Sequence, residues 1–199
     1  MLILTEEYVT EITAPSAEPV SRTETKLHLR VDVTTDDTLI DSLIQASREY
    51  VENYTRRSFV QRTYRADFDH FDGEIRLPFG PVIAVSHVKY YTAASPSVLT
   101  TLAASNYELV RGVVCQSATG TYPSVDSVYN AVQVTYTAGY ASTSSPFDAA
   151  SDVPAAVKSA ILLTIGDLYE NREGQMLYPG QFQVNPTVMR LLDQYRVYE

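Results

Sequence analysis

The sequence predicts an α+β fold, in which a small helical bundle has a β-rich insertion between its two long helices. Apolar residues recur at helical spacing over 39–54 and again over 157–169. Between these stretches, from about 59 to 138, the period changes to the alternation of strands. Because neither long helix can bury its apolar stripe alone, we expect the two helices to pack together, with short helices near both ends of the chain.

The 199 residues divide into four predicted parts. These are an extended N-terminal arm over 1–20, a helical bundle from 21–58 and 152–199, a β-rich insertion over 59–140, and a connector over 141–151. Pro15 and Pro19 disfavour a helix in the arm. The connector reads ASTSSPFDAAS, a low-complexity composition typical of a loop.

Helix signals precede the first two predicted helices. Ser21 and Glu24 have capping-box spacing and predict a short helix that ends near Arg30. Asp36 and Asp37 suit the positive N-terminal end of the first long helix. Its apolar stripe consists of Leu39, Ile40, Leu43, Ile44, Tyr50, Val51 and Tyr54.

Alternating and β-branched segments predict the strands of the insertion. The segments are 60–68, 74–77, 82–91, a weaker pair at 107–110 and 113–114, and 132–137. Arg62 is the one misfit on the apolar face of the first strand. The stretches 92–105 and 116–128 are rich in Ser, Thr, Ala and Pro, which predicts loops.

Two helices are predicted at the C-terminal end of the chain. Asp152 is the expected cap of the second long helix, with Pro154 in its first turn and Gly174 as its stop. Its stripe consists of Val157, Ala160, Ile161, Thr164, Ile165, Leu168 and Tyr169. Asn185 and Pro186 predict the start of a short terminal helix.

Composition excludes several classes of protein. With 15 basic and 24 acidic residues the formal charge is −9, which disfavours a general nucleic-acid binder. The single cysteine, Cys115, excludes an intrachain disulfide and a cysteine-cluster zinc site. No run approaches the roughly 18 apolar residues that span a bilayer. We therefore expect a soluble protein without membrane contact, made in a reducing cytoplasm.

The search for catalytic motifs predicts no enzyme, no cofactor and no metal site. No nucleophile motif is present, and His28, His70 and His87 are isolated from one another. The stretch 67–73 is rich in Asp, but Phe71 interrupts the EF-hand pattern, which favours a solvated strand end. An enzyme with a dispersed pair of carboxylates stays open as an alternative.

One charge pattern departs from the acidic background. Four arginines occur without an intervening acid, at Arg56, Arg57, Arg62 and Arg65. They form either a docking patch for an acidic partner or a DNA backbone, or simply a helix end and an exposed strand face. The arm carries the opposite charge, at Glu6, Glu7, Glu11 and Glu18. Opposite charges at separate sites suggest head-to-tail assembly into a ring. Fifteen tyrosines also favour protein contacts.

The order of these segments resembles the head–tail connector (adaptor) proteins of tailed phages, a group also found in gene transfer agents. The segments are TAPSAEPVSRTETKLHLRVD, DDTLIDSLIQASREYVENYTRRSFVQRTY, GEIRLPFGPVIAVSHVKYY, VQVTYTAGYA and VPAAVKSAILLTIGDLYENRE, which together extend over about 13–198. The resemblance implies a structural virion protein that forms a ring, commonly of twelve subunits, beneath the portal. Such a ring extends the DNA channel and provides the docking surface for the stopper or tail.

The resemblance also implies partners and a location. The partners are the portal protein, a stopper or tail-completion protein and further copies of the chain, while genome DNA passes without sequence-specific binding. The protein is made in the host bacterial cytoplasm and ends in the virion neck. The C-terminal segment is expected to reach the portal through Met189, Leu192, Tyr195, Val197 and Tyr198. Two other hypotheses stay open, a tail-completion or stopper protein and a β-rich module that recognises glycan or protein.

Overall fold

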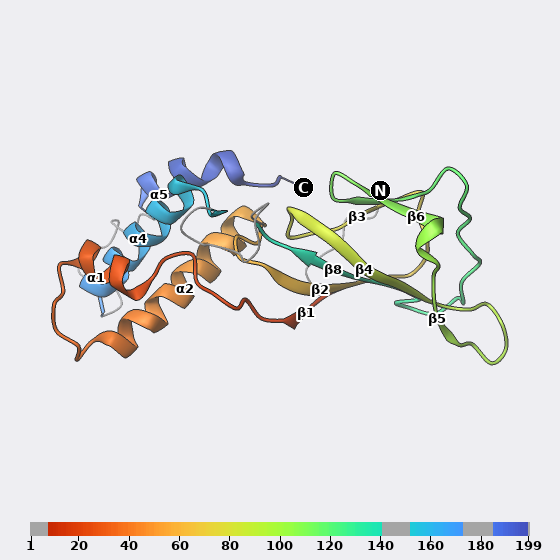
Figure 1. The fold of residues 1–199 in the computed structure, drawn as a ribbon, viewed down its shortest axis with the longest axis horizontal. Coiled ribbons are helices and arrows are strands. Elements are labelled where there is room, and N and C mark those ends of the chain that lie inside the picture. Colours follow the sequence, from red (N-terminus) through yellow and green to blue (C-terminus); the bar gives the residue numbers. More distant parts are fainter. Residues whose placement is uncertain (1–7, 141–151, 173–184, 199) are drawn as a thin grey trace, which may run out of the picture. The chain divides into compact units, whose positions relative to one another are not determined.

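The computed structural model describes residues 8–140, 152–172 and 185–198, which form two compact units (Figure 1). The β unit contains 8–16 and 61–140, and the helical unit contains 17–60, 152–172 and 185–198. Within the described residues there are four α-helices and two antiparallel sheets. The predicted α+β class is therefore confirmed.

The helical unit begins where the sequence predicts. The Ser21 side chain accepts a hydrogen bond from the backbone N–H of Glu24, 3.1 Å away, as the capping-box spacing indicates. Its helices are α1 (Arg22–Leu29), α2 (Asp37–Thr55), α4 (Ala155–Glu170) and α5 (Pro186–Leu192), followed by the 3₁₀ turn η3 (Asp193–Tyr195). Asn185 caps α5, and Pro186 is its first residue.

The two long helices, α2 and α4, pack against each other, and α5 packs on α4 (Figure 1). Their buried apolar side chains are Ile40, Ile44 and Val51 on α2, Val157, Ala160, Ile161 and Ile165 on α4, and Val188 and Leu192 on α5. The apolar stripes, which no single helix could cover, are thereby removed from water.

The prediction that Asp152 caps the second long helix is corrected, because α4 has Pro154 as its N-cap residue. A proline disfavours helical backbone in the residue before it. Gly174 lies outside the described residues.

A buried ion pair interrupts the apolar face of α2. The Arg48 guanidinium donates from Nη1 to Glu52 at 3.1 Å, and from Nε and Nη2 to Glu18 at 2.8 and 3.2 Å. The second oxygen of Glu52 accepts the backbone N–H of Phe59 at 2.8 Å. Glu18 precedes α1 and Phe59 follows α2, so one ion pair holds both chain segments against α2.

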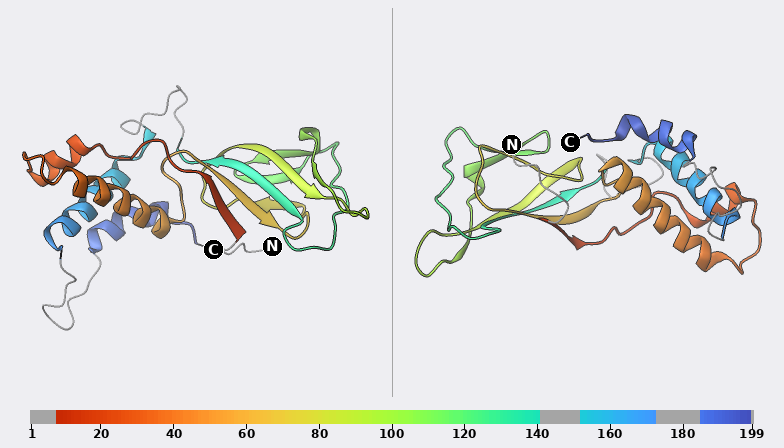
Figure 2. Two further views of the ribbon diagram at one scale, coloured as in Figure 1. Left: turned by 90° about the horizontal axis from the view of Figure 1, so that it is seen from below. Right: turned by 180° about the vertical axis from the view of Figure 1, so that it is seen from behind.

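The β unit contains two antiparallel sheets. The larger one has the order β1–β2–β8–β4–β5 and the smaller one β3–β7–β6 (Figure 2). The strands are β1 (Val9–Thr13), β2 (Arg62–Phe68), β3 (Glu74–Arg76), β4 (Val82–Tyr91), β5 (Leu99–Thr101), β6 (Tyr107–Val110), β7 (Val113–Gln116) and β8 (Val132–Ala138). A 3₁₀ turn, η2 (Ala104–Asn106), precedes β6.

Both sheets contribute to one core in the β unit. Tyr64 and Tyr136 of the larger sheet and Ile75 and Val114 of the smaller one are buried in the same cluster. Burial raises the pKa of Tyr136, and its hydroxyl donates to the Pro78 carbonyl at 2.9 Å. A buried hydroxyl is thus satisfied without interrupting the core.

Two of these strands are absent from the sequence-based expectation. β1 falls in the expected arm and β5 in an expected loop. Four of the five residues of β1 are exposed, so the strand has no buried face that alternation could reveal. It is held by its antiparallel ladder with β2, which pairs Val9 with Ala66. Residues 17–20 of the expected arm belong to the helical unit, where Val20 is buried.

The ion pair on α2 gives the first prediction. We expect Glu52→Ala to lower the free energy of unfolding of the helical unit by about 1–3 kcal/mol, because it removes one of the two carboxylates that contact buried Arg48 and the acceptor of the Phe59 N–H. Urea denaturation followed by circular dichroism measures the change. The matched control is Glu49→Ala, whose side chain is 51% exposed and 3.8 Å from Arg48, and for which we expect about 0–1 kcal/mol. Equal losses for the two variants would contradict this role.

Candidate functional site

The four arginines of the predicted patch divide between the two units. On β2 in the β unit, Arg62 is buried and donates to Glu11 of β1 at 2.8 Å. Arg65 lies 3.0 Å from Asp67 on the same strand. The misfit of Arg62 on an apolar face is thereby explained, since its charge is paired with an acid from a neighbouring strand. Two of the four arginines thus contact carboxylates within their own chain.

The described acids of the predicted arm belong to different units. Glu11 contacts Arg62, and Glu18 contacts Arg48 in the helical unit. Glu6 and Glu7 lie outside the described residues. The two described acids of the arm therefore pair with arginines of the same chain.

The other two arginines lie at the C-terminal end of α2, where residues 195–197 also lie. Arg56 is the left-handed C-cap of α2, and it is exposed. Arg57 donates from Nε to the backbone carbonyl of Tyr195 at 2.5 Å. The Thr55 carbonyl accepts the backbone N–H of Val197 at 3.0 Å. Two groups of residues that the sequence predicts as separate sites thus meet at one place.

Aromatic rings surround Arg196 at this place. Its guanidinium carbon lies 4.8 Å from the ring centre of Tyr54 and 5.1 Å from that of Tyr198. Tyr54 stacks on Tyr50 and donates its hydroxyl to Asp193 at 2.8 Å, a bond that raises the pKa of Tyr54. We call this the tyrosine–arginine surface, which consists of Tyr50, Tyr54, Arg56, Arg57, Arg196 and Tyr198.

Sequence reasoning missed Arg196 and the surface role of Tyr50 and Tyr54. The two tyrosines were assigned to the apolar stripe of the helix, but Tyr50 is exposed and Tyr54 half-buried. A usable signal was present, because Tyr50 and Tyr54 are four residues apart and precede an arginine pair. Tyrosine and arginine, with tryptophan, are enriched at the energetic centres of protein interfaces.

The five residues predicted to contact the portal differ in exposure. Leu192 is fully buried in the core of the helical unit, so it is unavailable to a partner while the unit is folded. Met189 is half-buried, and the Tyr195 ring makes a T-shaped contact with the Phe59 ring. Val197 and Tyr198 are 37% and 71% exposed. The surface residues of this set are therefore Val197 and Tyr198, beside Arg196.

The described residues contain no group of three or more His, Cys, Asp or Glu side chains that could hold a metal ion. In the Asp-rich stretch, Asp67 contacts Arg65, Asp69 accepts the backbone N–H of Asn130, and Asp72 lies 3.1 Å from His70. Burial is the main cause that raises the pKa of the Cys115 thiol, which disfavours the reactive thiolate.

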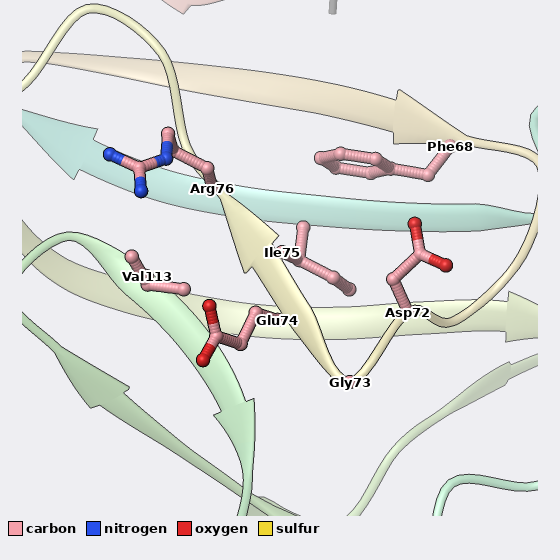
Figure 3. Close-up of a pocket in the computed structure, with 7 residues that line it drawn as sticks. All are labelled: Phe68, Asp72, Gly73, Glu74, Ile75, Arg76 and Val113. Carbon is pink, nitrogen blue, oxygen red and sulfur yellow. The ribbon is translucent and has the colours of Figure 1, made fainter. Parts of the chain in front are cut away.

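A cavity of about 360 Å³ adjoins β3. Its lining residues are Phe68, Asp72, Gly73, Glu74, Ile75, Arg76 and Val113 (Figure 3). The polar ends of Asp72, Glu74 and Arg76 do not converge on one point in Figure 3. The cavity therefore lacks the converging polar groups that a catalytic site requires.

The comparisons with known proteins point to one family. Residues 23–98 match the family model described as "Phage gp6-like head-tail connector protein". This match confirms the resemblance seen in the sequence. That description is of a structural connector, in line with the prediction of a non-enzymatic protein. No curated protein sequence matches the chain.

Three solved structures of gene transfer agent (GTA) particles contain chains with a similar fold. The neck of an empty GTA particle computed with C6 symmetry matches with a TM-score of 0.74 and 22% identity. The virion of a native gene transfer agent particle matches with 0.73 and 21%, and the neck of a native GTA particle computed with C12 symmetry with 0.70 and 22%. Each match covers 96% of both chains. This chain has the fold of those chains.

No described helix combines the length and the apolar character that crossing a membrane requires.

The difference in burial between Leu192 and Tyr198 gives a second prediction. We expect Leu192→Ala to lower the free energy of unfolding by about 2–5 kcal/mol, because it leaves a cavity in the core. Tyr198→Ala changes an exposed side chain, and we expect less than about 0.5 kcal/mol. Urea denaturation of both variants measures the two changes in the free energy of unfolding. A large loss of stability for Tyr198→Ala with none for Leu192→Ala would reverse the assignment.

The pKa values of Asp36 and Asp67 are shifted in opposite directions, which predicts opposite effects on stability when each aspartate is replaced by asparagine. The Tyr169 hydroxyl and the Arg172 guanidinium lower the pKa of Asp36, so its contribution to stability is lost as pH falls through that lowered pKa. Burial raises the pKa of Asp67, so its ionised form opposes folding and protonation relieves this. We expect Asp67→Asn to be stabilising at pH 7 and Asp36→Asn to be destabilising. Both differences should shrink when denaturation is measured at progressively lower pH.

Proposed function

We propose that this chain is a head–tail connector (adaptor) protein that lies in the neck of a virion or gene transfer agent particle. The observation that carries the proposal is the extent of the likeness. The match to the neck chains covers 96% of this chain, so it includes both units. The family match over 23–98 also crosses both units, from α1 through β4.

In this proposal the chain acts as a ring of identical subunits, with twelve copies beneath the portal. The neck of the native GTA particle was computed with C12 symmetry, which supports this number. The helical unit, a bundle with the β unit inserted between α2 and α4, forms the body of the ring. The portal protein binds on one side of the ring, and a stopper or tail-completion protein binds on the other.

The charge of the chain suits a conduit for DNA. The formal charge is −9, and a surface of net negative charge does not retain phosphate groups. The ring would thus extend the DNA channel without sequence-specific binding. Strand β2 carries two arginines that could attract phosphate. Each of them, Arg62 and Arg65, is paired with a carboxylate.

The tyrosine–arginine surface is the proposed contact with another protein of the neck. Val197 and Tyr198 are exposed there beside Arg56 and Arg57, and aromatic and arginine side chains favour protein interfaces. The proposed docking residues Arg62, Arg65 and Glu11 act within the β unit, where the Arg62–Glu11 contact holds β1 on the sheet.

Electron microscopy of the protein mixed with the portal of its own particle tests the function. We expect an additional annulus of density at one end of the portal. Portals unchanged at saturating protein would contradict the proposal. If the protein bound isolated tails in place of portals, it would be a stopper or tail-completion protein. Because such a protein can stay monomeric until it meets a portal, a monomeric state of the isolated protein does not contradict the proposal, and the portal must be present in the experiment.

A further inference from the structure

We propose that neighbouring subunits of the ring join through the larger sheet of the β unit, where β1 of one copy pairs antiparallel with the free part of β4 in the next copy. The inference rests on the proposed ring and identifies one contact between its subunits. The partner of each sheet edge is thus a second copy of this chain, and both strands of the contact belong to the described residues.

The larger sheet has two unfilled edges. At one edge lies β1, and at the other β5 covers only a part of β4. β5 has three residues and pairs with residues 89–91 of the ten-residue β4. The next backbone contact along this edge is the Leu102 N–H bond to the Val88 carbonyl at 2.8 Å. No described strand pairs with this side of 82–87 or with the outer side of β1, so both can bind a further strand.

The two edges match in direction and in length. Each neighbouring pair in the order β1–β2–β8–β4 is antiparallel, so β1 and β4 run in opposite directions. A second copy placed beside the first in the same orientation therefore presents its β1 antiparallel to the free part of β4. β1 has five residues, which is enough to pair with most of 82–87. Neither strand has to change direction to make the pair.

A β-bulge leaves an isoleucine exposed on each of these strands. The register of β1 with β2 skips Ile12, which is 53% exposed, and the register of β4 with β8 skips Ile83, which is 38% exposed. Bulges protect many edge strands from pairing, but a protective position suits a charged side chain and not an aliphatic one. Two isoleucines on two free edges instead favour a partner strand that covers them.

The two edges also lack the residues that usually prevent pairing, which are lysine and proline within the strand. β1 reads VTEIT, and 82–87 reads VIAVSH. The acid of β1, Glu11, already contacts Arg62 of its own subunit at 2.8 Å. Burial lowers the pKa of His87, which keeps the imidazole neutral at pH 7. No unpaired charge therefore has to leave water when the two strands meet.

The symmetry of the contact agrees with a ring. A contact between two different edges is heterologous, and it closes a ring when repeated by rotation. Pairing of β1 with β1, or of β4 with β4, would be isologous and would stop at a dimer. A strand from another protein could fill one of the edges, but it would leave the other open. A second copy fills both edges at once, so it is the partner that the sheet fits best.

Cross-linking between subunits tests the proposal. One chain carries Thr10→Cys and another carries Ser86→Cys, both with Cys115→Ser so that no other thiol is present. Thr10 lies in β1 and Ser86 in the free part of β4, and both are exposed. With a short bismaleimide reagent and the portal present, we expect covalent dimers from the mixture and none from either chain alone. A chain that carries both cysteines should give a ladder of oligomers.

Controls separate the edge contact from chance collisions and from added charge. Ser42→Cys, at an exposed serine of α2, should give only the background yield with Thr10→Cys. Ile83→Lys places a charge between the paired strands and should lower the yield of the mixed dimer about tenfold or more. Leu27→Lys, at a side chain that is 80% exposed on α1, should lower it less than about twofold. Circular dichroism confirms that each variant is folded.

The outcomes distinguish this contact from the connector function. The cross-linking is repeated with the protein alone at high concentration. Absence of the mixed dimer in both conditions would overturn the inference, while an annulus on the portal would still support the connector. Dimers of Thr10→Cys alone or of Ser86→Cys alone, in place of the mixed dimer, would also overturn it because they report an isologous contact. The mixed dimer without an annulus would leave the edge contact intact and reject the connector.

Discussion

The buried ion pair of Arg48 and Glu52 is the interaction on which the helical unit depends. It satisfies its charges with Glu18 and with the backbone of Phe59, so it joins the segments that precede α1 and follow α2 to one helix. A buried charge without a partner is costly, so these groups must stay together in the folded unit. The apolar contacts between α2 and α4 supply burial, while the ion pair specifies where the chain enters and leaves.

The charges of the chain have two different uses. At least five of the described arginines contact a carboxylate of their own unit, as Arg62 contacts Glu11 across two strands. At the end of α2 the arrangement is different, because Arg57 and Arg196 are held by a carbonyl and by aromatic rings. Neutral partners order these two side chains. The Tyr54 ring under Arg196 in turn donates its hydroxyl to the Asp193 carboxylate, so an acid also lies at this place.

The sequence predicted elements with a periodic buried face and failed where no such face exists. The starts of α2, α5 and β4 follow from caps, prolines and alternation. β1 and β5 were missed because they are short strands with little burial, held by backbone pairing with distant strands. For the candidate site, Arg56, Arg57, Val197 and Tyr198 were named from charge and position. Their meeting could not be predicted, since 138 residues separate Arg57 from Tyr195.

By itself the sequence determined the α+β class, the two long amphipathic helices and the absence of catalytic motifs. These are local properties, because period, capping and residue type act over a few neighbours along the chain. Only the tertiary structure decided that Arg48 is buried, that Leu192 belongs to the core and that the Arg196 guanidinium lies over the rings of Tyr54 and Tyr198. Each of these depends on groups brought together from distant positions, and a distance between such groups exists only once the chain has folded.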